Sequence, residues 1–318
     1  MTTLQHHIYD AFLEFKRICA ENNLRYWASA GTLIGAVIHK GFIPWDDDMD
    51  IIMPREDYTR FVDIVLHSGN GRYGISCFED GKHLCPYYFA KFYIKDCTLW
   101  ESKQFPNIIG PWVDVFPVDN YNEQDGFSLN DQYILAIGRY RRSISHQTWG
   151  DIYRDLRRGY ITNAMMKTMR KCFSRFARHN RYARLLEIRD KITKLPGDHA
   201  YFLYGQEWSD DEGAKRFIFE KELLQSFVEV PFEDTTIFIP EHFHEILLKG
   251  YPHYQVIPPV EQRYGGHPCY YVDLDHVKTI DEVRAELGDD DSDRESVFTF
   301  KEFWKVLKER IRYRKENI

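Results

Sequence analysis

Apolar residues recur at helical spacing in the first part of the chain. From Leu4 to Cys19 they are separated by three or four positions, and the pattern ends at Asn22-Asn23. Because residues three and four positions apart lie on the same side of an α-helix, this spacing predicts a helix over residues 4–22.

Short β-prone segments and short helical patterns alternate over the next hundred residues. Such alternation is typical of chains in which helices pack on a sheet. We therefore expect an α+β (α/β) fold. The predicted strands are 24–28, 49–53, 87–94 and 112–118, and the predicted helices are 29–37 and 57–66.

A strongly basic stretch follows. Residues 139–194 contain 16 Lys and Arg but only four acids, a local charge of +12 in a chain of net charge −7, so the remaining residues sum to −19. Apolar residues recur every three or four positions among these cations, which predicts one or two amphipathic helices with a basic face. Two interpretations are open: contact with an anionic membrane or an acidic glycan, or a solvated basic face above an ordinary apolar stripe. A further helical pattern at residues 300–314 predicts a closing helix.

Composition limits the class of protein. The 318 residues are 43% hydrophobic and 29% charged, which excludes a disordered chain and a collagen-like fibre. No apolar run approaches the roughly 18 residues of a membrane helix, and the N-terminus shows no secretory signal. The six cysteines form no C-x-x-C pair, so we expect reduced thiols in a cytoplasmic protein. The negative net charge argues against nucleic-acid binding.

The most informative segment is the acidic run that precedes the predicted strand 49–53. Four of the five residues from Asp46 to Asp50 are aspartates, and such carboxylates repel one another unless a cation neutralises them. If the strand extends back through this run, Asp46, Asp48 and Asp50 point to one face. Oxygen ligands favour Mg²⁺ or Mn²⁺ over zinc. A solvated acidic turn is the alternative, but the Met-Asp-Ile-Ile-Met strand argues against it.

Three kinds of metal site compete for this run. An EF-hand loop beginning at Asp46 would need Gly at its sixth position and Glu at its twelfth, where the chain has Ile51 and Asp57, so that interpretation fails. A DxD glycosyltransferase would use Asp48 and Asp50, although such enzymes usually place a large nucleotide-binding unit before the motif. A two-metal phosphoryl or nucleotidyl transferase needs two adjacent acids and a third from another strand.

The third acid has a clear candidate in the predicted strand 112–118. Asp114 lies between Val113 and Val115 in that apolar segment. Upstream of the acidic run, Gly31-Thr32 forms a small-residue turn at a predicted helix N-terminus, where a phosphate can bind. The Gly-Thr pair is weak evidence alone, but the combination of Gly-Thr, D-x-D and an apolar-Asp-apolar strand is much stronger.

These motifs resemble the LicD family, phosphocholine transferases of bacterial surface glycans that are related to the fukutin proteins. The resemblance is carried by residues 26–51, which include Gly31-Thr32 and the acidic run, and by a second block at residues 112–119. Residues 258–267 resemble the family's third block. One departure is residues 251–254, Tyr-Pro-His-Tyr, where the family often has a Tyr-Gly-Asp turn.

The resemblance implies a fold of the nucleotidyltransferase type, in the DNA polymerase β superfamily, with a mixed sheet flanked by helices. It implies Mg²⁺ or Mn²⁺, two ions in all, held by Asp48, Asp50 and Asp114, with Asp46 as a further ligand or a supporting group. The donor would be CDP-choline or another CDP-alcohol such as CDP-ribitol, and the acceptor would be a sugar hydroxyl of a glycan or lipid-linked oligosaccharide. We predict that Asp114 or a nearby acid deprotonates that hydroxyl and that CMP leaves.

Further residues are candidates for binding the substrates. Gly31, Thr32 and Lys91 would contact donor phosphate, and Arg263 and His267 would contact phosphate or acceptor. For Lys91 a plain surface lysine is the alternative.

We expect three parts: a catalytic core at residues 1–125, a basic helical insertion at 126–198 that contacts acceptor or membrane, and residues 199–318, which complete the site. The basic insertion leaves open a peripheral position at the inner face of the plasma membrane. A catalytically silent glycan-binding or scaffold protein is the alternative from another class.

Overall fold

The computed structural model describes residues 1–69, 71–82, 84–121, 126–145, 149–194, 199–201, 218–265, 269–288 and 308. The predicted closing helix at 300–314 lies outside these residues, apart from position 308. Among the helices of the described part, none combines the length and the apolar character needed to cross a bilayer.

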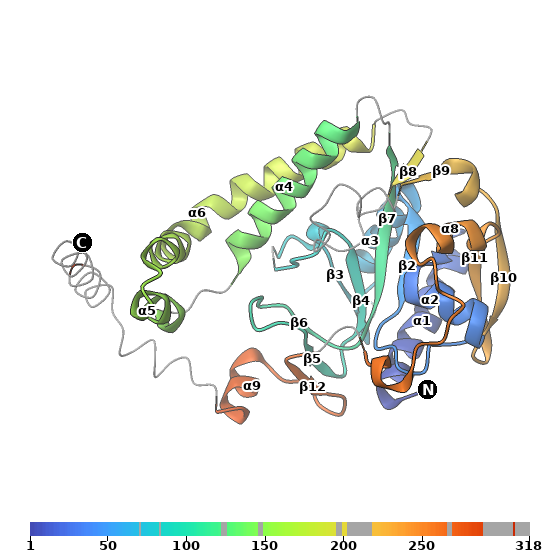
Figure 1. The fold of residues 1–318 in the computed structure, drawn as a ribbon, viewed down its shortest axis with the longest axis horizontal. Coiled ribbons are helices and arrows are strands. Elements are labelled where there is room, and N and C mark those ends of the chain that lie inside the picture. The colour runs from blue at the N-terminus through green and yellow to red at the C-terminus, as the bar shows by residue number, and fades with distance from the viewer. Residues whose placement is uncertain are drawn as a thin grey trace.

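A mixed sheet forms the centre of the molecule (Figure 1). Its main strands run in the order β1-β2-β7-β4-β3. Strands β2 and β7 are parallel, and the other pairs are antiparallel. Two further strands continue the sheet from the end of β7 through β8 and β9. The bounds are β1 (Trp27–Ala28), β2 (Asp50–Pro54), β3 (Tyr73–Ser76), β4 (Ala90–Ile94), β7 (Trp112–Tyr121), β8 (His199–Tyr201) and β9 (Ile218–Glu220).

One face of the sheet packs against the N-terminal helix. Helix α1 (Thr3–Glu21) begins with a capping box in which the Thr2 and Gln5 side chains each bond to the other residue's backbone N–H, a common helix start. Its apolar side joins one core with Ile51 and Val115 of the central strands. The same core takes in α3 (Arg55–His67), the hairpin of β10 (Phe227–Phe232) and β11 (Thr235–Pro240), and α8 (Phe243–Gly250).

The other face packs against a helical arm. Helices α4 (Gly126–Ile144) and α6 (Ile161–Ile192) share a second core with Ile52 and Phe116. The arm then projects away from the sheet, and α5 (Trp149–Arg157) lies near its far end (Figure 1). Strand alternation separates the two cores, because Ile51 and Ile52 point to opposite faces.

A small second sheet lies below the first (Figure 1). It consists of β12 (Tyr271–Asp273), β5 (Thr98–Trp100) and β6 (Ile108–Ile109), and α9 (Ile280–Glu286) packs on it through Val283. Short elements complete the described fold: α2 (Ala30–Ile34), a π-helical turn (Gly35–His39), and 3-10 turns at Phe78–Asp80, Lys221–Leu224 and Val260–Gln262.

The predicted fold class, a mixed sheet flanked by helices, is confirmed, but two predicted strands are shorter than expected and a third is shifted by one residue. The first contains only Trp27–Ala28, and β4 begins at Ala90 rather than at residue 87. Strand β2 begins at Asp50, so the prediction that Asp46, Asp48 and Asp50 share one strand face is wrong. The reason is a turn before the strand, closed by a hydrogen bond from the Asp46 N–H to the Ile43 carbonyl (2.9 Å).

Candidate active site

Strand register places two aspartates and a lysine side by side on three neighbouring strands. Asp50 of β2 pairs with Asp114 of β7, and Asp114 pairs with Lys91 of β4. Because residues in register point to the same face of a sheet, the three side chains form a row. All three are buried, with 3%, 6% and 2% of their surfaces exposed.

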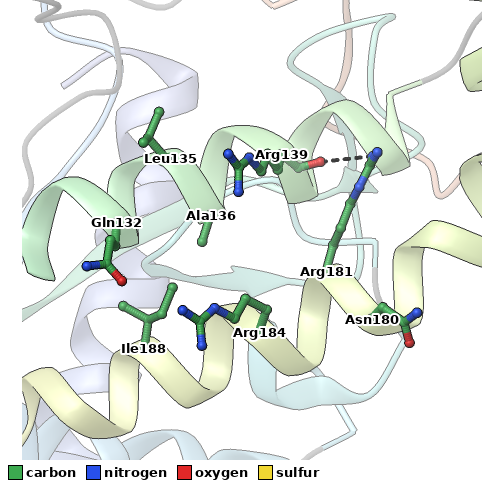
Figure 2. A pocket seen from close by; sticks show the side chains of 8 residues that line it. All are labelled: Gln132, Leu135, Ala136, Arg139, Asn180, Arg181, Arg184 and Ile188. Carbon is green, nitrogen blue, oxygen red and sulfur yellow. Dashed lines mark hydrogen bonds between the residues drawn. The ribbon is translucent and has the colours of Figure 1, made fainter.

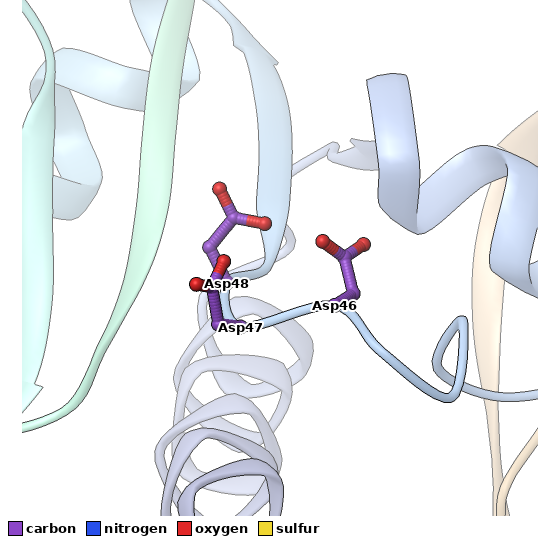
Figure 3. A group of neighbouring side chains, drawn as sticks. All are labelled: Asp46, Asp47 and Asp48. Carbon is purple, nitrogen blue, oxygen red and sulfur yellow. The ribbon is translucent and has the colours of Figure 1, made fainter. Parts of the chain in front are cut away.

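Asp48 joins this row from the loop before β2. Carboxylate oxygens of Asp48, Asp50 and Asp114 lie within 4.8 Å of one another. A second set within the same limit comprises Asp46, Asp47 and Asp48, and Figure 3 shows the Asp46 and Asp48 carboxylates on the same side of the loop. Asp48 therefore belongs to both sets.

Lys91 contacts the acids directly. Its Nζ donates to both oxygens of Asp114 (3.0 and 3.3 Å) and lies 3.4 Å from Oε2 of Glu101. It also lies 3.8 Å from the ring centroid of Trp112, whose Nε1 donates to Asp114 (3.1 Å). Burial alone would lower the pKa of Lys91, but the charges of Asp114 and Glu101 outweigh it and the pKa is raised, so Lys91 stays charged.

One lysine does not balance this cluster. Burial raises the pKa of Asp114 to about 6, and Asp48 adds to the rise although Lys91 opposes it. Burial, followed by the charges of Asp48 and Asp47, raises the pKa of Asp46 to about 7. A buried, all-oxygen donor set with excess negative charge fits a hard divalent cation such as Mg²⁺ or Mn²⁺.

Buried polar contacts hold the acidic loop in place. The Gln5 side chain, 1% exposed, donates to the carbonyls of Ile43 (3.1 Å) and Asp46 (2.9 Å). The Asp114 N–H donates to the Met49 carbonyl (2.8 Å). The loop is therefore tied to α1 on one side and to β7 on the other.

Gly31 and Thr32, predicted to bind phosphate, lie next to the acids. The Thr32 hydroxyl oxygen accepts a hydrogen bond from the Asp50 N–H (2.8 Å), so this side chain positions the start of β2. A Cβ at Gly31 would lie 2.7 Å from Oδ2 of Asp46, which explains the absence of a side chain there. Phosphate binding by these two residues stays a prediction.

The third sequence block returns to the acidic loop. The guanidinium of Arg263 lies 5.1 Å from the ring centroid of Trp45, and its Nε donates to the Pro258 carbonyl (2.8 Å). A Cβ at Gly265 would come within 2.2 Å of Oδ2 of Asp47, so the two segments are in close contact. His267 lies outside the described residues.

Two residues of this site, Glu101 and Gln5, were not predicted from the sequence. Glu101 follows β5 and accepts a hydrogen bond from the Tyr87 hydroxyl (2.6 Å) as well as facing Lys91. No local pattern distinguishes either residue, because each reaches the acids only through tertiary packing.

Acids at the start of two parallel strands, in a mixed sheet covered by helices, define a domain of the nucleotidyltransferase type. Residues 23–147 match the family profile described as LicD/FKTN/FKRP, nucleotidyltransferase domain. This part of the chain is therefore a LicD-family domain, and the resemblance noted in the sequence is confirmed.

Individual relatives extend this similarity. The chain is 27% identical over 253 residues to the lipopolysaccharide cholinephosphotransferase LicD of Haemophilus influenzae, and the alignment covers 80% of this chain and 90% of that protein. An uncharacterized protein of Rickettsia typhi is 41% identical over 58 residues, 18% of this chain and 19% of that protein. Another from Rickettsia prowazekii is 35% identical over 78 residues, 24% of this chain and 29% of that protein.

Proposed function

We propose that this protein is a metal-dependent transferase that moves phosphocholine from CDP-choline to a sugar hydroxyl of a cell-surface glycan and releases CMP. The LicD-family domain and the related cholinephosphotransferase support a phosphotransferase enzyme. The observation that carries the metal-dependent reaction is the convergence of Asp48, Asp50 and Asp114 oxygens within 4.8 Å.

In this scheme Asp48, Asp50 and Asp114 hold the divalent ions, and Asp46 supports them from the adjoining loop. The bound ions would neutralise the donor's diphosphate and the negative charge of the departing CMP. Lys91 and Trp112 fix the orientation of the Asp114 carboxylate through the hydrogen bonds described above. Their role is to keep one ligand oxygen in place before the donor binds.

The reaction exchanges one phosphoester bond for another. The acceptor oxygen forms a bond to the phosphorus that carries the choline, and the bond from that phosphorus to the oxygen it shares with CMP breaks. The hydroxyl proton passes to Asp114 or to a neighbouring acid. Arg263 lies against Trp45 at the edge of the acidic loop, where its charge can attract the donor's phosphates or an anionic acceptor.

The test is product analysis with a panel of donors. We expect Mg²⁺-dependent CMP release from CDP-choline with a lipopolysaccharide acceptor, with phosphocholine recovered on the glycan by mass spectrometry. Preferred turnover of CDP-ribitol would keep the reaction but change the alcohol. Release of pyrophosphate from CTP and phosphocholine would indicate nucleotidyl transfer instead, and release of a nucleoside diphosphate from a nucleotide-sugar would indicate a glycosyltransferase. Either of these two outcomes would overturn the proposal.

A further inference from the structure

Three large apolar side chains in the first half of α6 lie on the outside of the helix. Met165, Met166 and Met169 are 44%, 51% and 61% exposed, whereas Ala164 and Thr168 are 0% and 7% exposed. The three methionines are one, three or four positions apart and share one side of the helix. An amphipathic helix of a soluble domain normally turns such a stripe inward, so this stripe requires another explanation.

Exposed cations and tyrosines precede the methionine stripe in the sequence. Arg154, Arg157 and Arg158 are exposed on and just after α5, and Tyr153 and Tyr160 are 37% and 56% exposed. Residues 149–172 contain six Lys and Arg and two acids, a local charge of +4. These groups lie toward the end of the arm that is remote from the sheet (Figure 1).

The positive charge continues along the arm toward the sheet. A pocket of about 340 Å³ lies between α4 and α6. It is lined by Arg139, Arg181 and Arg184 together with apolar and amide side chains (Figure 2). The Arg181 guanidinium donates to the Arg139 carbonyl (3.3 Å), which holds it across the pocket. The exposed apolar stripe and the cationic pocket thus belong to one elongated element.

We propose that the outer part of the arm, residues 149–172, docks on the surface of an anionic phospholipid bilayer. Exposed apolar side chains, flanking cations and interfacial tyrosines are the features of a helix that lies in a membrane interface. The methionines would enter the acyl boundary, and the arginines would contact lipid phosphates. This binding is independent of the transferase reaction, because no residue of the acid cluster takes part.

The charge of residues 149–172 favours an anionic bilayer over two other partners for this surface. A second copy of the chain would place one face of charge +4 against another. The chain's own residues 300–314 contain six Lys and Arg and two acids, so this segment is also positive and would be repelled. An anionic bilayer satisfies both the apolar stripe and the cations.

The test is sedimentation of the full chain with vesicles. We expect binding to vesicles of phosphatidylcholine and phosphatidylglycerol in equal amounts, little binding to phosphatidylcholine alone, and loss of binding at high salt. The triple variant Met165→Ser, Met166→Ser, Met169→Ser should bind at least about tenfold more weakly. A second variant, Arg154→Gln, Arg157→Gln, Arg158→Gln, should bind roughly 100-fold more weakly, at about fivefold per charge.

The matched control replaces three exposed apolar residues outside the arm, Leu13, Leu66 and Val277, by Ser and should bind as the wild type does. Equal binding by the wild type and both arm variants would overturn the proposal.

Peroxide oxidation of the methionines, followed by mass spectrometry, provides an independent measurement. We expect rapid oxidation of Met165, Met166 and Met169 in the free protein and protection on vesicles. Protection already present without vesicles would mean that another part of the chain or a second copy covers the stripe, and would also overturn the proposal.

Discussion

Lys91 balances part of the charge in the candidate site. It is a fully desolvated lysine whose ammonium contacts Asp114 and Glu101 and lies against the Trp112 ring. Buried ion pairs are weak stabilisers as a whole, but removing one partner leaves an uncompensated buried charge. The effect of removing Lys91 should therefore depend on whether a divalent cation is bound.

We predict that Lys91→Met lowers the free energy of unfolding by about 3–5 kcal/mol in EDTA and by clearly less in saturating Mg²⁺. The reason is that a bound cation supplies positive charge to the same carboxylates. Urea unfolding in the two buffers measures this difference. Lys82→Met, an exposed position between β3 and β4, is the control and should change neither value. An equal loss of stability with and without Mg²⁺ would contradict the shared charge balance.

The raised pKa of Asp114 predicts how stability changes with pH. Its folded-state pKa of about 6 is above the ordinary value of about 4, so the native state retains a proton that the unfolded chain has lost. In EDTA the proton on Asp114 should therefore add to the free energy of unfolding at low pH. This added stability should decline by roughly 3 kcal/mol in total as the pH rises from about 4 through 6. Asp114→Asn cannot titrate, so its unfolding free energy should fall less over this interval. Parallel pH profiles for the two proteins would contradict the assignment.

At the scale of elements, α1 and the acidic loop act as one unit. Gln5 is part of the capping box that begins α1, and its side-chain amide also holds the loop carbonyls of Ile43 and Asp46. A single side chain therefore connects the start of a helix to the position of the proposed metal ligands, which are more than forty residues away in sequence.

We predict that Gln5→Leu destabilises the protein by about 1–3 kcal/mol, because buried carbonyls lose their donor, and that it also weakens Mg²⁺ binding. Thr2→Ala is the matched control: it removes the helix cap, costs about 1 kcal/mol, and leaves the loop contacts in place. Urea unfolding and calorimetric Mg²⁺ titration of both variants separate the two effects. If Gln5→Leu keeps wild-type Mg²⁺ affinity, the loop does not need this anchor.

Local patterns were sufficient to predict part of this site. Asp50 and Asp114 were identified because a carboxylate inside an apolar strand is a local anomaly, visible in the sequence. The prediction that Asp46 and Asp48 lie on the same strand as Asp50 is wrong. The chain makes a turn from Ile43 to Asp46, and β2 begins only at Asp50. Glu101 reaches Lys91 through the packing of a second sheet, and its neighbours in sequence carry no sign of that contact.

At the scale of the whole molecule, the two faces of the sheet have different covers. One face packs on α1, α3 and the C-terminal hairpin, and the other packs on the base of the arm. Ile51 and Val115, the strand neighbours of Asp50 and Asp114, belong to the core shared with α1. Because successive side chains of a strand point to opposite faces, Asp50 and Asp114 lie on the arm's side of the sheet. Residues 258–265, from the C-terminal part, contact the neighbouring acidic loop at Trp45 and Asp47, so segments far apart in the sequence meet beside the site.

In the proposed function, Asp48, Asp50 and Asp114 form a metal site that drives release of CMP. The most direct measurement is the initial rate of CMP release from CDP-choline in Mg²⁺, with acceptor glycan, for the wild type and for Asp50→Asn. Asp63→Asn, on the exposed side of α3, is the matched control and should keep the wild-type rate. We predict a loss of at least about 100-fold for Asp50→Asn, and near-normal CMP release by this variant would contradict the account.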